Sequence, residues 1–249
     1  MVVLDAGTGI RRLGAAIDPD VKRVDILLTH FHLDHVQGLG FFGPLFRPGF
    51  DVHIWGPASK HHDLADRLTR YLSLPLFPVT LNELPCHLCL HEAPETPFSL
   101  PGLDAVAGRV RHRGRTVGYR LTDASGSMAY LPDHELELEM LSRSASCRLS
   151  PAELIAGVDL LVHDAQYSAT EYRSHIGWGH SSINDVVAFA ADARVGRLVA
   201  FHHDPTHDDR AIDELVAGAV RSSGHTIDVA AAAEGAVLEP TPLARESAA

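Results

Sequence analysis

The feature that most constrains this chain is a group of metal-ligand side chains placed directly after an apolar segment. Residues 24–29 (VDILLT) are typical of a buried strand, and four ligand-type residues follow within six positions: His30, His32, Asp34 and His35. In an extended segment His30 and His32 point to the same side, so two imidazoles can reach one metal ion. A helix beginning near Leu33 would project the other two toward a second position close by. This spacing predicts a two-ion site that can activate water, rather than a loop of exposed histidines.

The composition is that of a globular protein with an unusually large number of histidines. The 249 residues include 17 histidines, 45% of the residues are hydrophobic, and the formal net charge is −11. No apolar run approaches the roughly 18 residues that span a bilayer, and no leader segment is visible, so no membrane association is expected. Three cysteines do not describe a disulfide framework, which favours a cytoplasmic location. The acidic balance argues against a nucleic-acid partner.

Strand-like and helix-like segments alternate along the chain, which predicts one α/β domain over residues 1–240 and a disordered tail at 241–249. Strands are expected at residues 2–5, 24–29, 51–55, 106–112, 117–121, 128–131, 159–162, 197–201 and 236–238. Helices are expected at 61–73, at 183–190 with Ser181 or Ser182 as the cap, and at 208–220. Histidine clusters recur at the carboxyl ends of these strands, where loops usually carry the chemistry.

Several spaced motifs resemble the metallo-β-lactamase fold, and in particular its phosphodiesterase branch. That branch includes RNase Z and the cyclic phosphodiesterase of phosphonate breakdown. The motifs are HFHLDH (30–35), LDAGTG (4–9), VRHRGRTVGYRL (110–121), YLPD (130–133), LLVHDAQY (160–167), GWGHSS (177–182) and LVAFHH (198–203). The resemblance implies a four-layer αββα sandwich. Members usually begin with a further hairpin, whereas here Met1 directly precedes the first strand, so this hairpin is expected to be lacking. Either the start codon is placed late or a sheet edge is exposed.

The resemblance also implies a ligand set for two zinc ions per chain, with Mn²⁺ or Fe²⁺ as alternatives. One ion would be held by His30, His32, His112 and Asp133, and the other by Asp34, His35, His202 and the shared Asp133. Strand alignment favours His202 over His203 as the last ligand. Nitrogen and oxygen donors with open positions for water suit a catalytic zinc site. Taken alone, His112 fits a polar strand end equally well, and Asp133 fits a turn or helix cap better.

The resemblance gives His180 the role of protonating the leaving oxygen. It lies between Gly179 and Ser181, just before an expected helix, and the alternative is an exposed neighbour of the helix cap. Asp164 would fix the His180 tautomer, or would instead orient a metal-binding histidine. Asp5 is a candidate for that same orienting task.

Weaker features surround these residues. Trp178, between two glycines, is a candidate wall of the substrate site. The alternating arginines at 109, 111, 113 and 115 could bind an anion, although such a strand face is more often simply solvated. Cys86 and Cys89 suggest half of a zinc site or a redox pair, but without a second cysteine pair coincidence explains them better.

The sequence therefore predicts a hydrolase that cleaves a small or cyclic phosphodiester by attack of metal-bound hydroxide, with Asp34, His180 and Asp164 as catalytic residues. A small-molecule substrate is expected, and a homodimer is allowed. The alternatives are a carboxyl-ester, lactone or thioester hydrolase on the same metal site, and a non-catalytic metal-dependent binding protein. A di-iron redox site is disfavoured, because such members usually replace one motif histidine with Glu.

Overall fold

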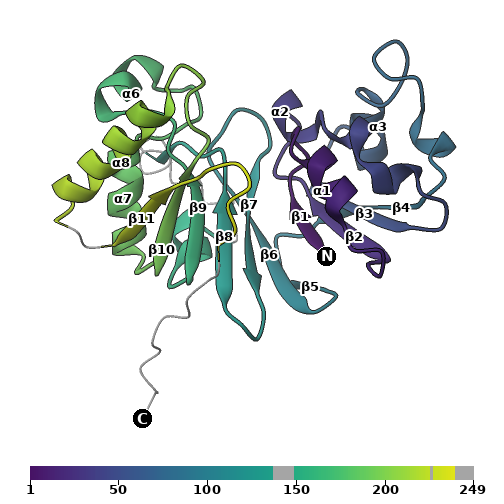
Figure 1. Cartoon of the computed structure of the whole chain (residues 1–249), viewed down its shortest axis with the longest axis horizontal. Coiled ribbons are helices and arrows are strands. Elements are labelled where there is room, and N and C mark those ends of the chain that lie inside the picture. Colours follow the sequence, from purple (N-terminus) through teal and green to yellow (C-terminus); the bar gives the residue numbers. More distant parts are fainter. Residues whose placement is uncertain (137–148, 225–226, 239–249) are drawn as a thin grey trace. The chain divides into compact units, whose positions relative to one another are not determined.

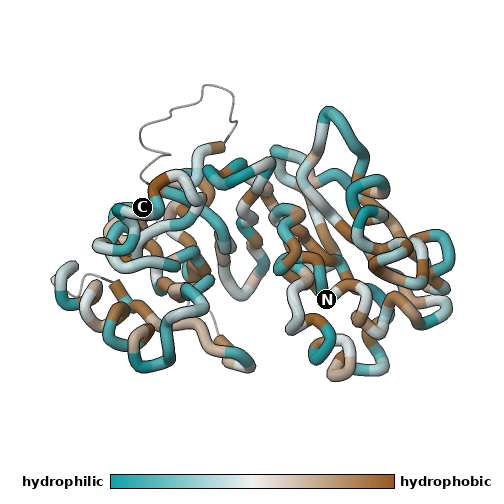
Figure 2. The backbone as a smooth tube through the Cα atoms, turned by 90° about the horizontal axis from the view of Figure 1, so that it is seen from above, coloured by the Kyte–Doolittle hydropathy of each residue, from teal (hydrophilic) through white to brown (hydrophobic). Residues whose placement is uncertain are grey.

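The chain folds into two compact units, Met1–Pro94 and Glu95–Ala249, in the computed structural model (Figure 1). The structure describes residues 1–136, 149–224 and 227–238. The predicted tail at 241–249 lies outside these ranges. Hydrophobic stretches occur in both units (Figure 2), and each unit has its own core.

The first unit is built on a four-stranded parallel sheet. Its strands, in spatial order, are β1 (Val2–Leu4), β2 (Arg23–Leu27), β3 (Asp51–Pro57) and β4 (His87–Ala93). The α-helices are α1 (Ile10–Ala16), α2 (Leu33–Val36) and α3 (Leu64–Thr69), and 3₁₀ turns occupy η1 (Leu39–Phe41), η2 (Gly43–Phe46) and η3 (Leu81–Glu83). β1 lies at one edge of this sheet.

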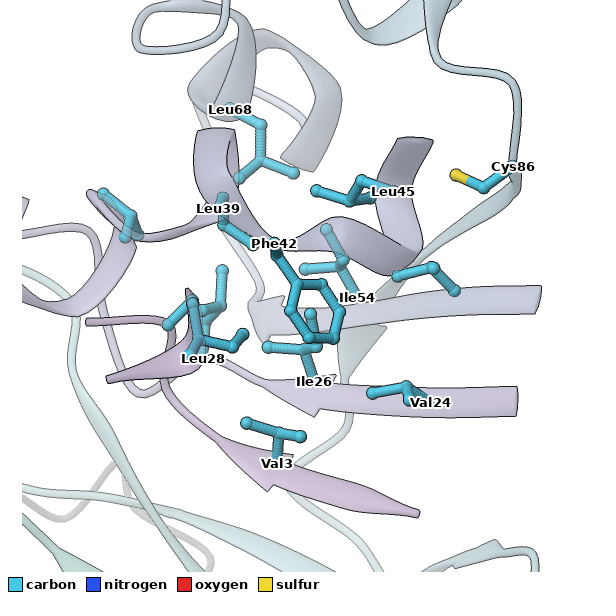
Figure 3. Close-up of a cluster of buried hydrophobic side chains, with 14 of the residues drawn as sticks. Val3, Val24, Ile26, Leu28, Leu39, Phe42, Leu45, Ile54, Leu68 and Cys86 are labelled. Atoms are coloured by element: carbon cyan, nitrogen blue, oxygen red, sulfur yellow. The ribbon is translucent and has the colours of Figure 1, made fainter. Parts of the chain in front are cut away.

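The core of this unit lies on one face of the sheet (Figure 3). Val24 and Ile26 of β2 point to that face because alternate residues of a strand share a side, and both are fully buried. Phe42 packs over them, together with Leu39 and other side chains of the 3₁₀ turns. Burial of these apolar side chains therefore holds β2 in place, and His30 lies just beyond the end of this strand.

The helix predicted at 61–73 is shorter than expected. Asp63 caps α3 by accepting a hydrogen bond from the Asp66 N–H at 2.7 Å, so the helix begins at Leu64 and ends at Thr69. Leu72 is 2% exposed although it lies in a turn beyond the helix. Its helix-like spacing therefore reflects burial of a turn rather than a continued helix.

The second unit is built on a seven-stranded sheet in the order β11-β10-β9-β8-β7-β6-β5. Its strands are β5 (Phe98–Leu100), β6 (Leu103–Arg109), β7 (Val117–Thr122), β8 (Ser127–Leu131), β9 (Leu160–Asp164), β10 (Arg197–Phe201) and β11 (Asp228–Ala231). β5 to β8 pair in antiparallel fashion, and β8 to β11 pair in parallel fashion. The helices are α5 (Pro151–Ile155), α6 (Ala169–His175), α7 (Ile183–Asp192) and α8 (Asp209–Ser222).

Helix α7 covers the parallel part of this sheet with the apolar stripe that marked it in the sequence. Ile183, Val186 and Ala190 are buried in one cluster with strand residues such as Leu161 and Leu198. Of the two candidate caps, Ser182 is the one used, since its hydroxyl accepts from the Asp185 N–H. Ser181 instead donates to the His134 carbonyl.

Two strand predictions in this unit are corrected. The strand expected at 106–112 ends at Arg109, because pairing with β7 begins at Arg109 opposite Val117 and the residues between form the connection. The strand expected at 236–238 is absent, and β11 forms earlier, at Asp228–Ala231, paired with β10. Its alanine-rich sequence has low β propensity, and pairing with β10 overrides that preference. Across the described residues, no helix combines the length and apolar character that a bilayer crossing requires.

Candidate metal centre and active site

The first unit brings together the four donors of the HFHLDH motif. His30 lies after β2, and Asp34 and His35 lie on α2, which begins directly after His32. The ring centroid of His30 is 4.4 Å from that of His32 and 4.2 Å from that of His35. His30 and His35 are buried, whereas His32 and Asp34 are exposed. The predicted clustering within this motif is therefore present.

Asp5, which directly follows β1, orients this group. It is buried and in the left-handed region at φ 57°, and it accepts from the Thr29 N–H at 2.7 Å. His35 Nδ1 lies 2.8 Å from its Oδ2 and donates to it, so the lone pair of His35 is on Nε2 and points away from Asp5. Nε2 lies 3.1 Å from Asp34 Oδ2. Two electron-pair donors at this separation suit a cation placed between them.

The glycines of this region allow α2 to approach the loop after β1. A Cβ at Gly7 would lie 2.7 Å from the Asp34 carbonyl oxygen, and one at Gly38 would lie 2.0 Å from the Gly7 carbonyl oxygen. The Ala6 N–H donates to the His35 carbonyl at 2.8 Å across the same contact. The LDAGTG motif therefore holds the helix that carries Asp34 and His35.

The second unit gathers its donors at the carboxyl ends of three neighbouring parallel strands. Asp133 follows β8, Asp164 ends β9, and His202 follows β10. In the register, Leu131 pairs with His163 and Phe201 pairs with Asp164, so the three strands end at one level. Asp133 and Asp164 are almost fully buried.

His112 joins this group from the turn after β6, not from the strand predicted for it. Its Nδ1 donates to the Gly179 carbonyl at 2.7 Å, which leaves Nε2 to face Asp133 Oδ1 at 3.6 Å. His202 Nε2 lies 3.5 Å from the same oxygen. These separations are close to the ~3.3 Å edge between two ligands of one tetrahedral zinc ion. His202, the ligand preferred over His203, is thus the one beside Asp133.

His180 and Asp164 form the pair that the sequence predicted. His180 Nδ1 lies 2.6 Å from Asp164 Oδ2 and donates to it, and the same nitrogen is 3.9 Å from Asp133 Oδ1. Asp164 also accepts from the Ser181 and Gln166 N–H groups. Burial raises the pKa of Asp164. The hydrogen bond from His180 has the opposite but smaller effect on this pKa. The His180 ring stacks on His202 with centroids 4.9 Å apart.

The donors within each unit have the chemistry of a divalent metal site. Asp133, Asp164, His180 and His202 each place one ligand-type atom within 4.8 Å of the others, all in the second unit. Asp164 and His180 are hydrogen-bonded to each other, so the donors directed at a cation from this group are Asp133 and His202. With His112, they form an imidazole and carboxylate set of the kind that binds catalytic zinc.

Two buried groups beside this site were not predicted. Glu135 is 1% exposed and accepts from the N–H groups of Gly177 and Gly179 at 2.6 and 2.8 Å. His134 Nδ1 lies 3.0 Å from His163 Nε2, and burial lowers the pKa of His163 to about 4, so this ring is neutral near pH 7. Only their positions next to Asp133 and Asp164 in the sequence could have indicated them.

Cys86 and Cys89 do not form a pair. Cys86 is buried in the core of the first unit, whereas Cys89 is exposed on β4, and both are free. This agrees with the interpretation that their spacing is a coincidence.

A two-sheet α/β chain with imidazole and carboxylate donors at its strand ends is the architecture of a metal-dependent hydrolase. The Beta-lactamase superfamily domain matches residues 1–203, and the chain belongs to this superfamily. The predicted fold class and the assignment as a hydrolase are thereby confirmed. A ribonuclease Z of Nocardia farcinica is 30% identical in an alignment of 261 positions, which covers 86% of this chain and 80% of that protein.

Solved structures share the fold. The metallo-beta-lactamase fold protein YhfI from Bacillus subtilis has a TM-score of 0.67 and 17% identity, covering 96% of this chain and 87% of that one. A diphosphatase from the PhnP family has a TM-score of 0.61 and 20% identity, covering 92% and 76%.

Proposed function

We propose that this chain is a dinuclear zinc-dependent phosphodiesterase, with Mn²⁺ or Fe²⁺ as alternative metals. His30, His32, His112 and Asp133 would hold one ion, and Asp34, His35, His202 and the shared Asp133 the other. Support comes from the superfamily match and from the orientation of the donors, since His35 and His112 each have Nδ1 anchored and Nε2 directed at a carboxylate of the predicted ligand set. Two bound dications would supply hydroxide near neutral pH and neutralise charge on phosphoryl oxygens.

The observation that carries the proposal is the His180–Asp164 pair. Phosphodiester cleavage requires a proton for the leaving oxygen, and an imidazole is a suitable donor near neutral pH. Asp164 accepts from Nδ1, so a proton that His180 takes up and passes to the leaving oxygen would be carried on Nε2, in the imidazolium form that the Asp164 carboxylate stabilises. Asp34, which is exposed beside His35, would orient the attacking water.

The substrate is a phosphodiester, either a small or cyclic molecule or an RNA. The net charge of −11 favours the small substrate, whereas the ribonuclease Z relative favours RNA. RNA is therefore a candidate substrate, although the net charge alone argues against it.

The proposal is tested with chelated protein that has been reloaded with zinc. We expect hydrolysis of bis(p-nitrophenyl) phosphate that depends on metal, and little hydrolysis of p-nitrophenyl acetate or a homoserine lactone. His180→Ala should lower kcat about 10²- to 10⁴-fold with zinc retained, because it removes a proton donor and no ligand. His112→Ala should lose zinc as well.

Three outcomes would contradict the proposal. Full activity after thorough chelation would exclude the metal mechanism. Preferential cleavage of the acetate or lactone would favour the ester-hydrolase alternative. An unchanged kcat in His180→Ala would remove this residue from the reaction.

A further inference from the structure

Residues 177–179 form a short loop in which nearly all backbone N–H and C=O groups are hydrogen-bonded to other residues of the second unit. The Gly177 and Gly179 N–H groups donate to Glu135, and the Trp178 N–H donates to the His175 carbonyl at 3.0 Å. The two glycine carbonyls accept from Arg113 Nε at 3.2 Å and from His112 Nδ1 at 2.7 Å. Both glycines have positive φ, 85° and 99°, which favours glycine at these positions. The loop is therefore preorganised.

Glu135 is the anchor of this loop. It is a carboxylate with 1% exposure, and it receives a third hydrogen bond from the Tyr172 hydroxyl at 2.9 Å. Hydrogen bonds to an ionised acceptor are stronger than neutral ones, which compensates for burying the charge. Glu135 is thus a buried carboxylate whose hydrogen bonds hold three residues in place. This indicates that a fixed position of the loop is important.

The loop presents an exposed indole, and a row of ring contacts links this indole to the proposed proton donor. Trp178 is 54% exposed, and its ring meets the His175 ring edge-on at 4.8 Å. His175 stacks on Tyr167 at 4.4 Å, and Tyr167 meets the His180 ring at 6.2 Å. A large exposed indole supported from behind by a row of rings is suited to stacking a flat ligand.

A cation is fixed beside this surface. Arg113 is exposed, and its Nε bond to Gly177 holds the guanidinium next to the loop. Guanidinium groups bind phosphate oxygens with good geometry. An exposed indole with an arginine beside it is suited to bind a planar base that is linked to a phosphate.

We propose that Trp178 and Arg113 bind a nucleotide that flanks the scissile phosphodiester. The base stacks on the indole, and the adjoining phosphate pairs with the guanidinium. This rests on the proposed phosphodiesterase function and makes its substrate class nucleotides rather than phosphodiesters without a base.

Binding is measured through Trp178 fluorescence in a Trp55→Phe background, where Trp178 is the remaining tryptophan. The zinc-loaded protein is titrated with uridine 5′-monophosphate and with ribose 5-phosphate, which has the same sugar and phosphate but no base. We expect quenching and tighter binding with the nucleotide. Arg113→Ala should weaken nucleotide binding in the same titration.

Selectivity is measured with two substrates that share a leaving group, thymidine 5′-(p-nitrophenyl phosphate) and methyl p-nitrophenyl phosphate. Trp178→Ala should lower the ratio of their kcat/KM values roughly 5- to 150-fold, the range expected for loss of one base–aromatic stack, and Trp178→Phe should restore much of it. Ile176→Ala removes a neighbouring exposed apolar side chain and should leave the ratio unchanged.

Equal binding of nucleotide and ribose phosphate, or an unchanged ratio in Trp178→Ala, would overturn the nucleotide site. Failure of the phosphodiesterase proposal would look different. The zinc-loaded protein would then cleave neither substrate, while uridine monophosphate would still quench Trp178, and the site would stand as a nucleotide-binding site.

Discussion

Several histidines of this chain have one ring nitrogen anchored by a neighbour. His35 donates from Nδ1 to Asp5, His112 to the Gly179 carbonyl and His180 to Asp164, at 2.8, 2.7 and 2.6 Å. An anchored Nδ1 fixes both the tautomer and the ring orientation, so that Nε2 is the nitrogen that can bind a metal ion or take up a proton. Two of the partners are side-chain carboxylates, and the third is a backbone carbonyl. The sequence can indicate the two carboxylates, because they depend on the residue type, but it cannot indicate the carbonyl.

The backbone partner of His112 gives a prediction with a matched control. A Cβ at Gly179 would lie 2.3 Å from His112 Nδ1, whereas one at Gly177 would meet nothing within 4 Å. Both sites have positive φ, so either alanine should lower the free energy of unfolding by about 1–2 kcal/mol. Only Gly179→Ala should also lose bound zinc, because the His112 ring must move. Urea unfolding and elemental analysis measure the two effects, and full zinc content in Gly179→Ala would contradict the proposed role of His112.

At the scale of elements, strand ends were the predictable part of the site. The apolar runs at 24–29, 128–131 and 197–201 correspond to β2, β8 and β10, and each is followed by its expected donor. A buried strand that ends in His or Asp is visible in sequence because burial and ligand chemistry use different residue types. His112 was assigned to a strand but lies in a turn, because only pairing with β7 determines where β6 ends.

Tertiary contacts account for what the sequence did not indicate. Glu135 resembles any surface glutamate until the loop at 177–179 folds over it. The Gly179 carbonyl has no sequence signal as a histidine partner, since every residue offers a carbonyl. Leu72 fits a helical period although it packs from a turn, and β11 is alanine-rich although it pairs with β10.

The pairing of β3 with β4 brings two histidines together and predicts a pH dependence of stability. His53 Nδ1 lies 2.9 Å from His91 Nε2, and the rings are stacked. Burial lowers the pKa of both side chains below the ordinary value near 6.5. As the pH falls through about 6.5, the unfolded chain takes up protons that the folded pair does not, so the free energy of unfolding decreases.

Urea unfolding at pH 7.5 and at pH 5.5 tests this. The double variant His53→Gln/His91→Gln should lose less stability between these pH values than the wild type. His61→Gln, at an exposed histidine, serves as the control and should lose as much as the wild type. An equal loss in the double variant would show that the pair does not titrate as inferred.

At the scale of the whole molecule, each unit has its own sheet, its own core and its own set of donors. His30, His32, Asp34 and His35 belong to the first unit, and His112, Asp133 and His202 to the second. Each set could bind metal independently, or both sets could share the same two ions, as we propose. The two arrangements predict different zinc contents in combined variants, because ligands of one ion act as a unit.

Zinc content per chain after desalting distinguishes these arrangements. With shared ions, His30→Ala and His112→Ala each remove the same ion, so His30→Ala/His112→Ala should keep as much zinc as either single variant. His30→Ala/His202→Ala removes a ligand from each ion and should lose both, which makes it the matched control. Independent sites would instead make the His30/His112 losses additive, so that this double variant would be empty. Additive losses would therefore disprove the shared centre, even if every single variant were inactive.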